Sequence, residues 1–380
     1  MAYRQINTRS PFYVQLATTE PVAQLELRIW TGDVATDKPT AATYTLTKEA
    51  LGGEATLEIS ELIRDYCTQD DSNTAAVVWV ETRFTDFNVI TADAGIYIAT
   101  EGYTVFTEGL QHNGQTFEDE YICLPEDPKP NNSGVSGAAY DKVFRVAGAA
   151  GEGSLFSYLV QPTDEVSWTK TFYFANGGSY TQPIMPSTDS GGQIRAISLS
   201  DSISKMVFNF NGTSILVIHD IFDCNKYNPN DNTSLSYATG AARAITLYYV
   251  NKQGAKNSLA FTLKHTEDIS TTSDTFKRNV SNLASMNHSG GMHASRKRLT
   301  GSKQSFTINT DYLNEYFVKQ VEEIILSEYV WAKIHSIESG YRLPVNVTNT
   351  KLTKKNHLND GLIQYTFTIE SASEYLNNVR

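Results

Sequence analysis

Alternating apolar and polar residues run through much of the chain and predict β-strands. The clearest case lies between residues 12 and 30, where two runs are separated by a turn at Glu20-Pro21 and Leu25, Leu27 and Ile29 alternate with polar side chains. Similar runs cover 41–47, 54–59, 77–85 and 94–107. They predict a β-sandwich-like N-terminal domain over 1–125, with a short helix over 60–67 and Ser60 as its N-cap.

A stretch rich in Pro, Gly, Ser and Asn follows, and we interpret residues 126–140 as a linker because they show no apolar periodicity. Short β-like runs then predict a central β domain over 141–265. Within it, Asn211-Gly212 predicts a tight hairpin turn, since both residues readily adopt positive φ angles. Residues 251–254 predict a second hairpin connection.

Residues 266–304 contain few aliphatic side chains and many Ser, Thr, Asn and Gly, so we predict a long polar loop that is exposed or ordered by a partner. A C-terminal α+β segment over 305–380 follows. Its helix is predicted to start with Thr310 as N-cap and to run to about Ser327, with Phe317, Val321 and Ile324 at helical spacing. The predicted fold class is mainly β with minor α, comprising two or three β-sandwich-like domains and a C-terminal helix packed on a sheet.

Length and charge narrow the functional classes. A chain of 380 residues is long enough for two or three cores, and its net charge of −11 disfavours general nucleic-acid binding, which needs clustered Lys and Arg. No apolar run reaches the ~20 residues that span a bilayer, so no membrane partner is expected. The three cysteines, Cys67, Cys123 and Cys224, form no C-x-x-C pair and predict neither a disulfide framework nor a cysteine zinc site. No cofactor is predicted.

Several residue groups are candidates for chemistry, although common catalytic motifs such as GxSxG, HExxH and the P-loop are absent. The run 118–120 (Glu-Asp-Glu), or Asp220 with Asp223, offers carboxylates for acid and base catalysis, yet solvated acidic turns are far commoner. Residues 228–232 offer oxygen ligands for Ca²⁺ but equally form a plain turn. His288 and His293 have a spacing that reaches one metal ion, but no third ligand is evident.

The densest basic cluster comprises four residues in the predicted polar loop, namely Arg296, Lys297, Arg298 and Lys303. In an acidic protein such a cluster favours contact with an acidic surface of a neighbouring subunit over contact with DNA, and plain solvation is as common as either. We therefore predict these four residues as a subunit contact.

Both ends of the chain resemble structural proteins of tailed bacteriophages that infect Bacteroidetes, including crAss-like tail and ring proteins. At the N-terminal end the resemblance rests on SPFYV (10–14), LELRIWTG (25–32) and EGYTVFTEG (101–109). At the C-terminal end it rests on NTDYLNE (309–315), IILSEYVW (324–331), LPVNVT (343–348), LNDGLIQYTFTIE (358–370) and NNVR (377–380). The middle, 125–300, shows only a generic β pattern.

The resemblance implies a non-enzymatic virion protein made in the host cytoplasm, present in many copies in a ring or collar of the tail or neck. Its partners would be copies of itself and other virion proteins, and DNA would at most pass through the assembly. Sheet edges suit pairing between copies, and a closed ring needs head-to-tail contacts.

Two other classes of function are alternatives. A receptor- or glycan-binding tail protein would use aromatic side chains such as Trp168, Tyr173 and Tyr180 as stacking platforms, although packing within strands is the simpler role for them. An accessory glycosidase on a β scaffold would need two of the carboxylates above to converge in one pocket.

Overall fold

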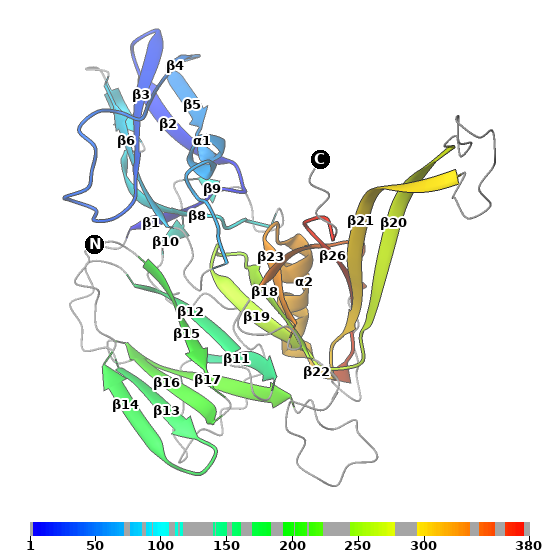
Figure 1. The fold of residues 1–380 in the computed structure, drawn as a ribbon. Coiled ribbons are helices and arrows are strands. Elements are labelled where there is room, and N and C mark those ends of the chain that lie inside the picture. The colour runs from blue at the N-terminus through cyan, green and yellow to red at the C-terminus, as the bar shows by residue number, and fades with distance from the viewer. Residues whose placement is uncertain are drawn as a thin grey trace, which may run out of the picture.

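The structure is a computed structural model that describes residues 3–71, 77–85, 89–92, 94–105, 111–112, 115–116, 140, 142–149, 154–160, 169–183, 193–200, 202–210, 213–222, 244–277, 295–334, 342–353 and 362–375. It is mainly β with two α-helices among the described residues, as the sequence predicts. Figure 1 shows an N-terminal sandwich, a central group of sheets below it, and a C-terminal sheet from which a long hairpin projects.

The N-terminal unit is a sandwich of two sheets. One sheet has the order β10-β1-β8-β6-β3-β4 and the other the order β5-β2-β7, with β9 also paired to β2. Its elements are β1 (Arg4–Asn7), β2 (Phe12–Thr18), β3 (Val22–Trp30), β4 (Tyr44–Glu49), β5 (Glu54–Glu58), α1 (Ser60–Arg64), β6 (Val78–Phe84), β7 (Val89–Ala92), β8 (Gly95–Thr100), β9 (Gln111–His112) and β10 (Gln115–Thr116).

The alternation read from the sequence forms the core of this sandwich. In β2, Tyr13 and Gln15 are more exposed, while Phe12 and Val14 are buried. Phe12 and Val14 belong to the same core cluster as Leu25 and Leu27 of β3 in the other sheet. Helix α1 begins near the predicted position, but Ser60 is not its N-cap. Ile59 occupies the cap position, and the Ser60 amide donates to the Glu58 carboxylate instead.

The central unit holds a five-stranded sheet, β11-β17-β16-β13-β14, and a two-stranded sheet, β12-β15. Phe156 and Phe208 meet in its core at a ring separation of 5.2 Å. Strands β16 and β17 form the predicted hairpin, because Phe210 pairs with Thr213 on either side of residues 211–212. The strands are β11 (Lys142–Ala149), β12 (Ser154–Val160), β13 (Thr169–Phe174), β14 (Ser179–Pro183), β15 (Gln193–Leu199), β16 (Ile203–Phe210) and β17 (Thr213–Phe222).

The C-terminal unit is built on a seven-stranded sheet, β19-β18-β23-β24-β26-β21-β20, with a small pair, β22-β25, beside it. Helix α2 packs on this sheet through Val321 and Ile324. The elements are β18 (Ile245–Val250), β19 (Lys256–Phe261), β20 (Thr266–Lys277), β21 (Ser295–Asn309), β22 (Leu313–Asn314), a 3₁₀ turn (Glu315–Phe317), α2 (Val318–Leu326), β23 (Val330–Ile334), β24 (Leu343–Val347), β25 (Leu362–Ile363) and β26 (Thr366–Ser371).

Three of the sequence predictions differ from the structure observed in the C-terminal unit. Residues 266–277 and 295–304 of the predicted polar loop belong to paired strands, because the backbones of β20 and β21 hydrogen-bond to each other although β20 has no buried apolar face. Strands β18 and β19 pair with the C-terminal sheet, although the predicted division at residue 265 groups them with the central domain. Thr310 is not the N-cap of the helix, which begins at Val318. The Thr310 amide instead donates to the Tyr365 carbonyl, and Thr310 Oγ1 accepts a hydrogen bond from the Tyr365 amide.

Candidate functional site: a projecting arm and the hub that carries it

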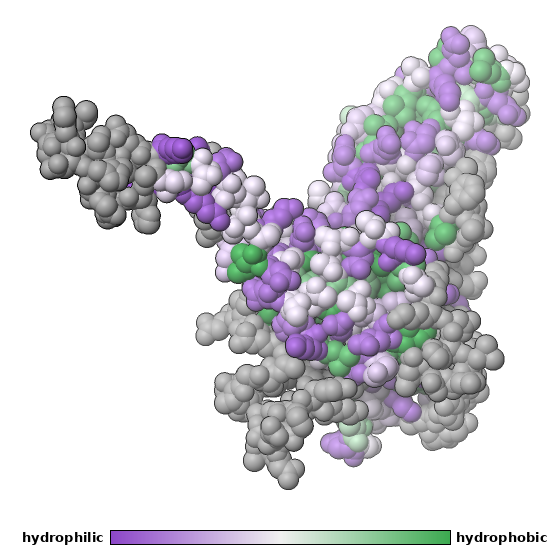
Figure 2. Space-filling view, turned by 90° about the vertical axis from the view of Figure 1, so that its right-hand side faces the viewer, coloured by the Kyte–Doolittle hydropathy of each residue, from purple (hydrophilic) through white to green (hydrophobic). Residues whose placement is uncertain are grey.

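A projecting feature of the described structure is the hairpin of β20 and β21, which we call the arm. Figure 1 shows it leaving the C-terminal sheet on the side opposite the N-terminal sandwich, and Figure 2 shows it standing clear of the body. Nearly every residue of β20 is exposed, including the apolar Ile269 at 50% and Phe276 at 47%. Strand β20 is also the edge of its sheet, so its outer backbone groups are unpaired by neighbouring strands of the described chain.

A β-bulge divides the arm into a base and a distal ribbon. Thr272 pairs with Gly301 and Ser273 with Leu299, so Thr300 is an extra residue. The base is held from its other side: β26 pairs with β21 from Ser305 onward, and the Tyr375 amide donates to the Ser302 carbonyl at 3.0 Å. Beyond the bulge, residues 273–277 and 295–299 form the distal ribbon, where the two strands pair only with each other among the described strands. Bulges bend strands and end pairing, which suits a point where the arm leaves its support.

Three of the four predicted contact residues lie on the distal ribbon, where all three are exposed. Arg296 is opposite Phe276 and Arg298 is opposite Asp274. Because alternate residues share a face, these four side chains lie on one face, while Lys297 lies on the other. Among the described residues none forms an ion pair with Arg296, Lys297 or Arg298.

Lys303 does not join them. It lies on the base of the arm, where its ammonium forms an ion pair with Glu370 of β26 at 3.1 Å. The structure therefore splits the predicted basic cluster into an available part on the ribbon and a paired residue at the root.

The other hairpin of the same sheet, β18 with β19, is its opposite in exposure, and we call it the hub. All twelve strand residues are buried, including the polar Lys256, Asn257 and Ser258. Strand β12 of the central unit covers part of β19: the Leu155 amide donates to Ser258 Oγ at 2.9 Å, and Ser157 Oγ donates to the Lys256 carbonyl at 2.5 Å. The hub thus joins the central unit to the C-terminal sheet.

The turn of the hub receives the N-terminal sandwich. The Gln253 carbonyl accepts hydrogen bonds from Gln5 Nε2 at 3.2 Å and from Thr100 Oγ1 at 2.9 Å. Asn251 holds the turn itself, because its side-chain oxygen accepts from two backbone amides across it. Gly254 has a φ of +80°, and a Cβ at that position would lie only 2.6 Å from Thr100 Cβ. Only glycine fits this close approach without strain.

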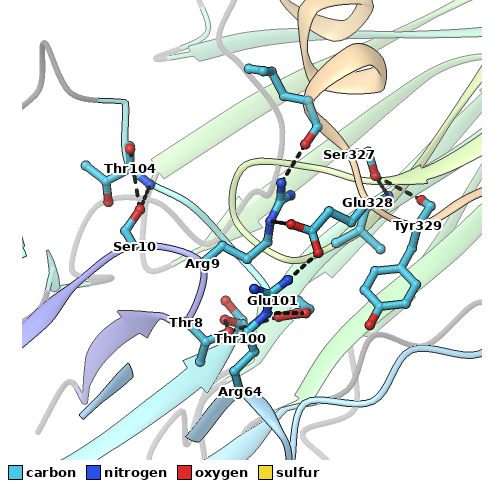
Figure 3. Close-up of polar contacts among 12 residues, drawn as sticks. Thr8, Arg9, Ser10, Arg64, Thr100, Glu101, Thr104, Ser327, Glu328 and Tyr329 are labelled. Carbon is cyan, nitrogen blue, oxygen red and sulfur yellow. Dashed lines mark hydrogen bonds and ion pairs between the residues drawn. The ribbon is translucent and has the colours of Figure 1, made fainter. Parts of the chain in front are cut away.

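A polar network fixes the same junction beside α2 (Figure 3). Glu101 is buried, where Thr8 Oγ1 donates to it at 2.9 Å and Arg64 Nε lies 3.3 Å away. The Arg64 guanidinium also pairs with Glu328, which follows α2, and Arg9 Nε pairs with Glu328 at 3.3 Å. Charged groups that satisfy each other across two units favour one relative orientation.

Lys256 makes a third contact between the hub and the N-terminal sandwich. Its side chain is 1% exposed, its ammonium donates to the Asp70 carbonyl at 2.5 Å and pairs with the Asp70 carboxylate at 3.2 Å, and it lies 5.1 Å from the centre of the Trp331 ring. Burial lowers the pKa of Lys256, and the Asp70 carboxylate partly offsets that effect. A cation that is desolvated here has partners from the N-terminal sandwich and the C-terminal sheet at once.

Glu323 is the buried acid of α2. Its carboxyl receives a hydrogen bond from the Lys252 backbone in the hub turn, while its Oε2 has no hydrogen-bond partner among the described residues. Burial raises the pKa of Glu323 to about 7, and the Lys252 contact opposes part of that rise. Near neutral pH this side chain therefore changes charge beneath the turn that holds the N-terminal sandwich.

The candidate catalytic carboxylates are not brought together in the described chain. Asp220 lies on β17 and pairs with Arg145 of β11 at 3.0 Å, which gives it a structural partner between neighbouring strands. Asp223 and residues 118–120 lie outside the described residues, so the predicted acid and base pair stays a prediction.

The candidate metal and glycan residues are placed only in part. Residues 228–232, His288, His293 and Trp168 lie outside the described ranges, and the described residues contain no cluster of three or more metal-ligating side chains. Tyr173 is partly buried and packs with Val143 and Val207, whereas Tyr180 on the edge strand β14 is 53% exposed. The two tyrosines point to no shared platform, because their strand positions, 173 opposite 179 and 172 opposite 180, place them on opposite faces.

Cys67 is buried, free and held beside Glu101 and Arg64. Burial raises the pKa of its thiol to about 12, and the Glu101 carboxylate adds to the rise. The thiol stays protonated and acts as a small apolar side chain of the sandwich core. Cys123 and Cys224 lie outside the described residues.

The polar junction is what sequence reasoning missed. Arg9, Arg64, Glu101 and Glu328 are far apart in the chain, and no local pattern indicates that their side chains meet. A signal did exist for α2: Gln320 and Glu323 fall between apolar positions on the stripe of Phe317, Val321 and Ile324, and both are buried.

Comparison with known proteins adds no identity, since no family model matches the chain and no curated protein matches it. Within the described part of the chain, no helix has the length and apolar character needed to cross a bilayer.

Proposed function

We propose that this protein is a non-enzymatic structural subunit of a tailed-bacteriophage virion, present in many copies in a ring or collar of the tail or neck. Its partners are copies of itself and other virion proteins, and DNA at most passes through the assembly. The protein is made in the host cytoplasm and ends in the virion. The resemblance of both chain ends to structural proteins of Bacteroidetes phages supports this assignment.

The single observation that carries the proposal is the arm. A two-stranded ribbon that is exposed on both faces is marginally stable in water, because it buries little apolar surface. An exposed ribbon with open edges also offers backbone groups to another chain. A long arm of this kind suits a subunit whose contacts are completed by a neighbour.

The hub supports the same function from the other side. It joins the N-terminal sandwich, the central unit and the C-terminal sheet through buried polar contacts. A fixed arrangement of the three units within each copy suits a ring, because closure of a ring depends on a constant angle between copies.

The test is the assembly state of the purified full chain. Size-exclusion chromatography with light scattering, followed by negative-stain imaging of any large species, should show closed rings of many copies. A monomer that persists at high protein concentration would contradict self-assembly. Incubation with host polysaccharide provides the matched test of the alternatives, because binding or hydrolysis there with no assembly would favour a glycan-binding protein or a glycosidase.

A further inference from the structure

We propose that the distal ribbon of one copy binds the outer end of the N-terminal sandwich of a second copy, through the ribbon face that carries Phe276, Arg296 and Arg298. The inference rests on the proposed self-assembly and deepens it, because it names the two surfaces that meet. Four residues define the receiving surface, which we call the sandwich tip: Val22, Glu49, Leu51 and Glu54.

The ribbon face has the composition of a binding surface. An exposed Phe276 stands directly opposite Arg296, and Arg298 follows on the same face two residues along. Aromatic and arginine side chains dominate the energetics of protein interfaces, whereas lysine is depleted there. Asp274 is the only acidic residue among the described residues of the ribbon, and it lies opposite Arg298. The ribbon face thus presents an apolar ring beside two guanidinium groups, one directly opposite it and one two residues along the partner strand.

The sandwich tip matches the ribbon face, because it carries opposite charges and also exposes apolar side chains. Leu51 is 79% exposed, the largest exposure among the large apolar side chains of the described residues, and Val22 is 45% exposed. Glu49 of β4 is the strand partner of Val22 of β3, and the backbones of Leu51 and Glu54 form an isolated antiparallel β-bridge. The four residues therefore belong to one end of the sandwich.

Both carboxylates of the tip are available. Glu49 and Glu54 are exposed, and within the described ranges neither forms an ion pair. Lys48 also lies on β4, but its ammonium is hydrogen-bonded to the Thr56 carbonyl. Two apolar side chains flanked by two free carboxylates therefore face solvent in a protein whose net charge is already −11.

The positions of the two surfaces favour contact between copies. The arm and the sandwich lie on opposite sides of the body (Figure 1), so a copy placed beside the first presents its sandwich to the arm of its neighbour. Such a contact joins two different surfaces and leaves the same pair open at each end, which is the head-to-tail geometry that builds rings. Opposite charges on the two surfaces also speed encounter and set the register of docking.

The experiment reverses the charges of each surface in the full chain. The arm variant carries Arg296→Glu and Arg298→Glu, and the tip variant carries Glu49→Arg and Glu54→Arg. All four residues are exposed, so urea unfolding should match that of the parent protein and show that each variant folds. Light scattering and sedimentation at 0.15 M salt should show assembly weakened by at least about tenfold for either variant.

Two further samples make the test specific. The protein with all four substitutions should regain most of the assembly, because the charges are again opposite. An equimolar mixture of the arm variant and the tip variant should also regain assembly, with the two variants in alternation, because each arm then meets a tip of opposite charge only on the other variant. Lys297→Glu is the matched control: it changes the same charge on the other face of the ribbon and should leave assembly within about twofold of the parent.

The outcomes separate the inference from the proposed function. Rings that form in the parent protein and persist in both variants would overturn the inference and leave the structural function standing. Failure of the parent protein to assemble would overturn both. An equal loss in the Lys297→Glu control, or a loss of binding to duplex DNA in the arm variant while assembly is unchanged, would also overturn it, because the arginine face would then have no specific role between copies.

Discussion

Two hairpins of the same sheet have opposite environments. In the hub, every strand residue is buried, even Lys256, Asn257 and Ser258. In the arm, the twelve residues of β20 are almost all exposed, even Ile269 and Phe276. The sheet order places them at its two ends, β19 at one edge and β20 at the other. Polarity alone therefore does not decide burial in this protein; what covers each edge does.

The difference follows from the partners that each edge finds within the chain. The hub edge is covered by β12 and by the N-terminal sandwich, which supply hydrogen bonds to its polar groups. Among the described residues the arm edge has no such cover. Its apolar side chains are exposed, as is common at surfaces that bind another protein. Within the described residues, the sheet therefore has one covered edge and one open edge.

The largest expected effect is a difference in unfolding free energy between alanine substitutions at two phenylalanines, one in each hairpin. Phe261 in the hub is 1% exposed and meets the Phe367 ring at 5.5 Å, whereas Phe276 in the arm is half exposed. Phe261→Ala should lower the free energy of unfolding by about 3–5 kcal/mol, because it leaves a cavity. Phe276→Ala should change it by less than about 0.5 kcal/mol. Urea unfolding followed by circular dichroism measures both, and similar losses would contradict the distinction.

A second prediction concerns pH, through Glu323 beneath the hub turn. Burial raises its pKa from an ordinary 4.5 to about 7, so the folded protein holds this proton more tightly than the unfolded chain does. The free energy of unfolding should therefore fall as pH rises from about 4.5 to about 7 and stay level above it. The loss from this group amounts to about 3 kcal/mol at most.

Glu323→Gln should remove that pH dependence. The variant should match the parent near pH 4 and exceed its free energy of unfolding at pH 8, because an amide carries no charge to desolvate. Glu322→Gln, one residue earlier on α2 and less buried, is the matched control and should retain the slope. Urea unfolding at several pH values gives the comparison, and an unchanged slope in Glu323→Gln would assign the pH effect to other groups.

A smaller effect is expected at the hub turn from Gly254→Ala. The added Cβ would meet Thr100 and the Glu101 amide, at 2.6 and 2.9 Å, and the residue would have to keep a φ of +80°. Gly177→Ala is the control, since it has a φ of +90° but open space around it. We expect a loss of about 1 kcal/mol for Gly177→Ala from backbone strain alone and about 1–2 kcal/mol more for Gly254→Ala.

Small-angle scattering distinguishes loosening from unfolding in the same two variants. If Gly254 sets the contact between the hub and the sandwich, Gly254→Ala should increase the radius of gyration, because the sandwich separates from the turn, and Gly177→Ala should leave it unchanged. Equal scattering curves for the two variants would show that the turn does not hold the sandwich.

The same contrast explains what the sequence could and could not predict. Strands of the sandwich were predictable because Phe12, Val14, Leu25 and Leu27 alternate with polar residues and face one core. The hairpin at residues 211–212 was predictable because its turn residues are specific. Both signals are local, and both lie where a strand has one apolar face.

The arm and the hub lacked such signals. Strand β20 is polar on both faces, so it has no alternation, and only backbone pairing with β21 makes it a strand. Lys256 suggests a solvated position, yet Asp70, nearly two hundred residues away in the chain, supplies its partner. Thr310 has the chemistry of an N-cap, but the backbone of Tyr365 takes its hydrogen bonds. Partners distant in sequence decided each of these cases.

The smallest expected effect comes from Lys303, which sequence reasoning grouped with the ribbon arginines. In its pair with Glu370 the lysine is exposed and the carboxylate is partly exposed, so Lys303→Ala should lower the free energy of unfolding by no more than about 0.5 kcal/mol. Assembly should be unchanged, because the side chain lies at the root of the arm, behind the bulge. Light scattering and urea unfolding of the full chain measure both. A loss of assembly in Lys303→Ala comparable with that of the arm variant would move the contact surface from the distal ribbon to the base, where β26 meets β21.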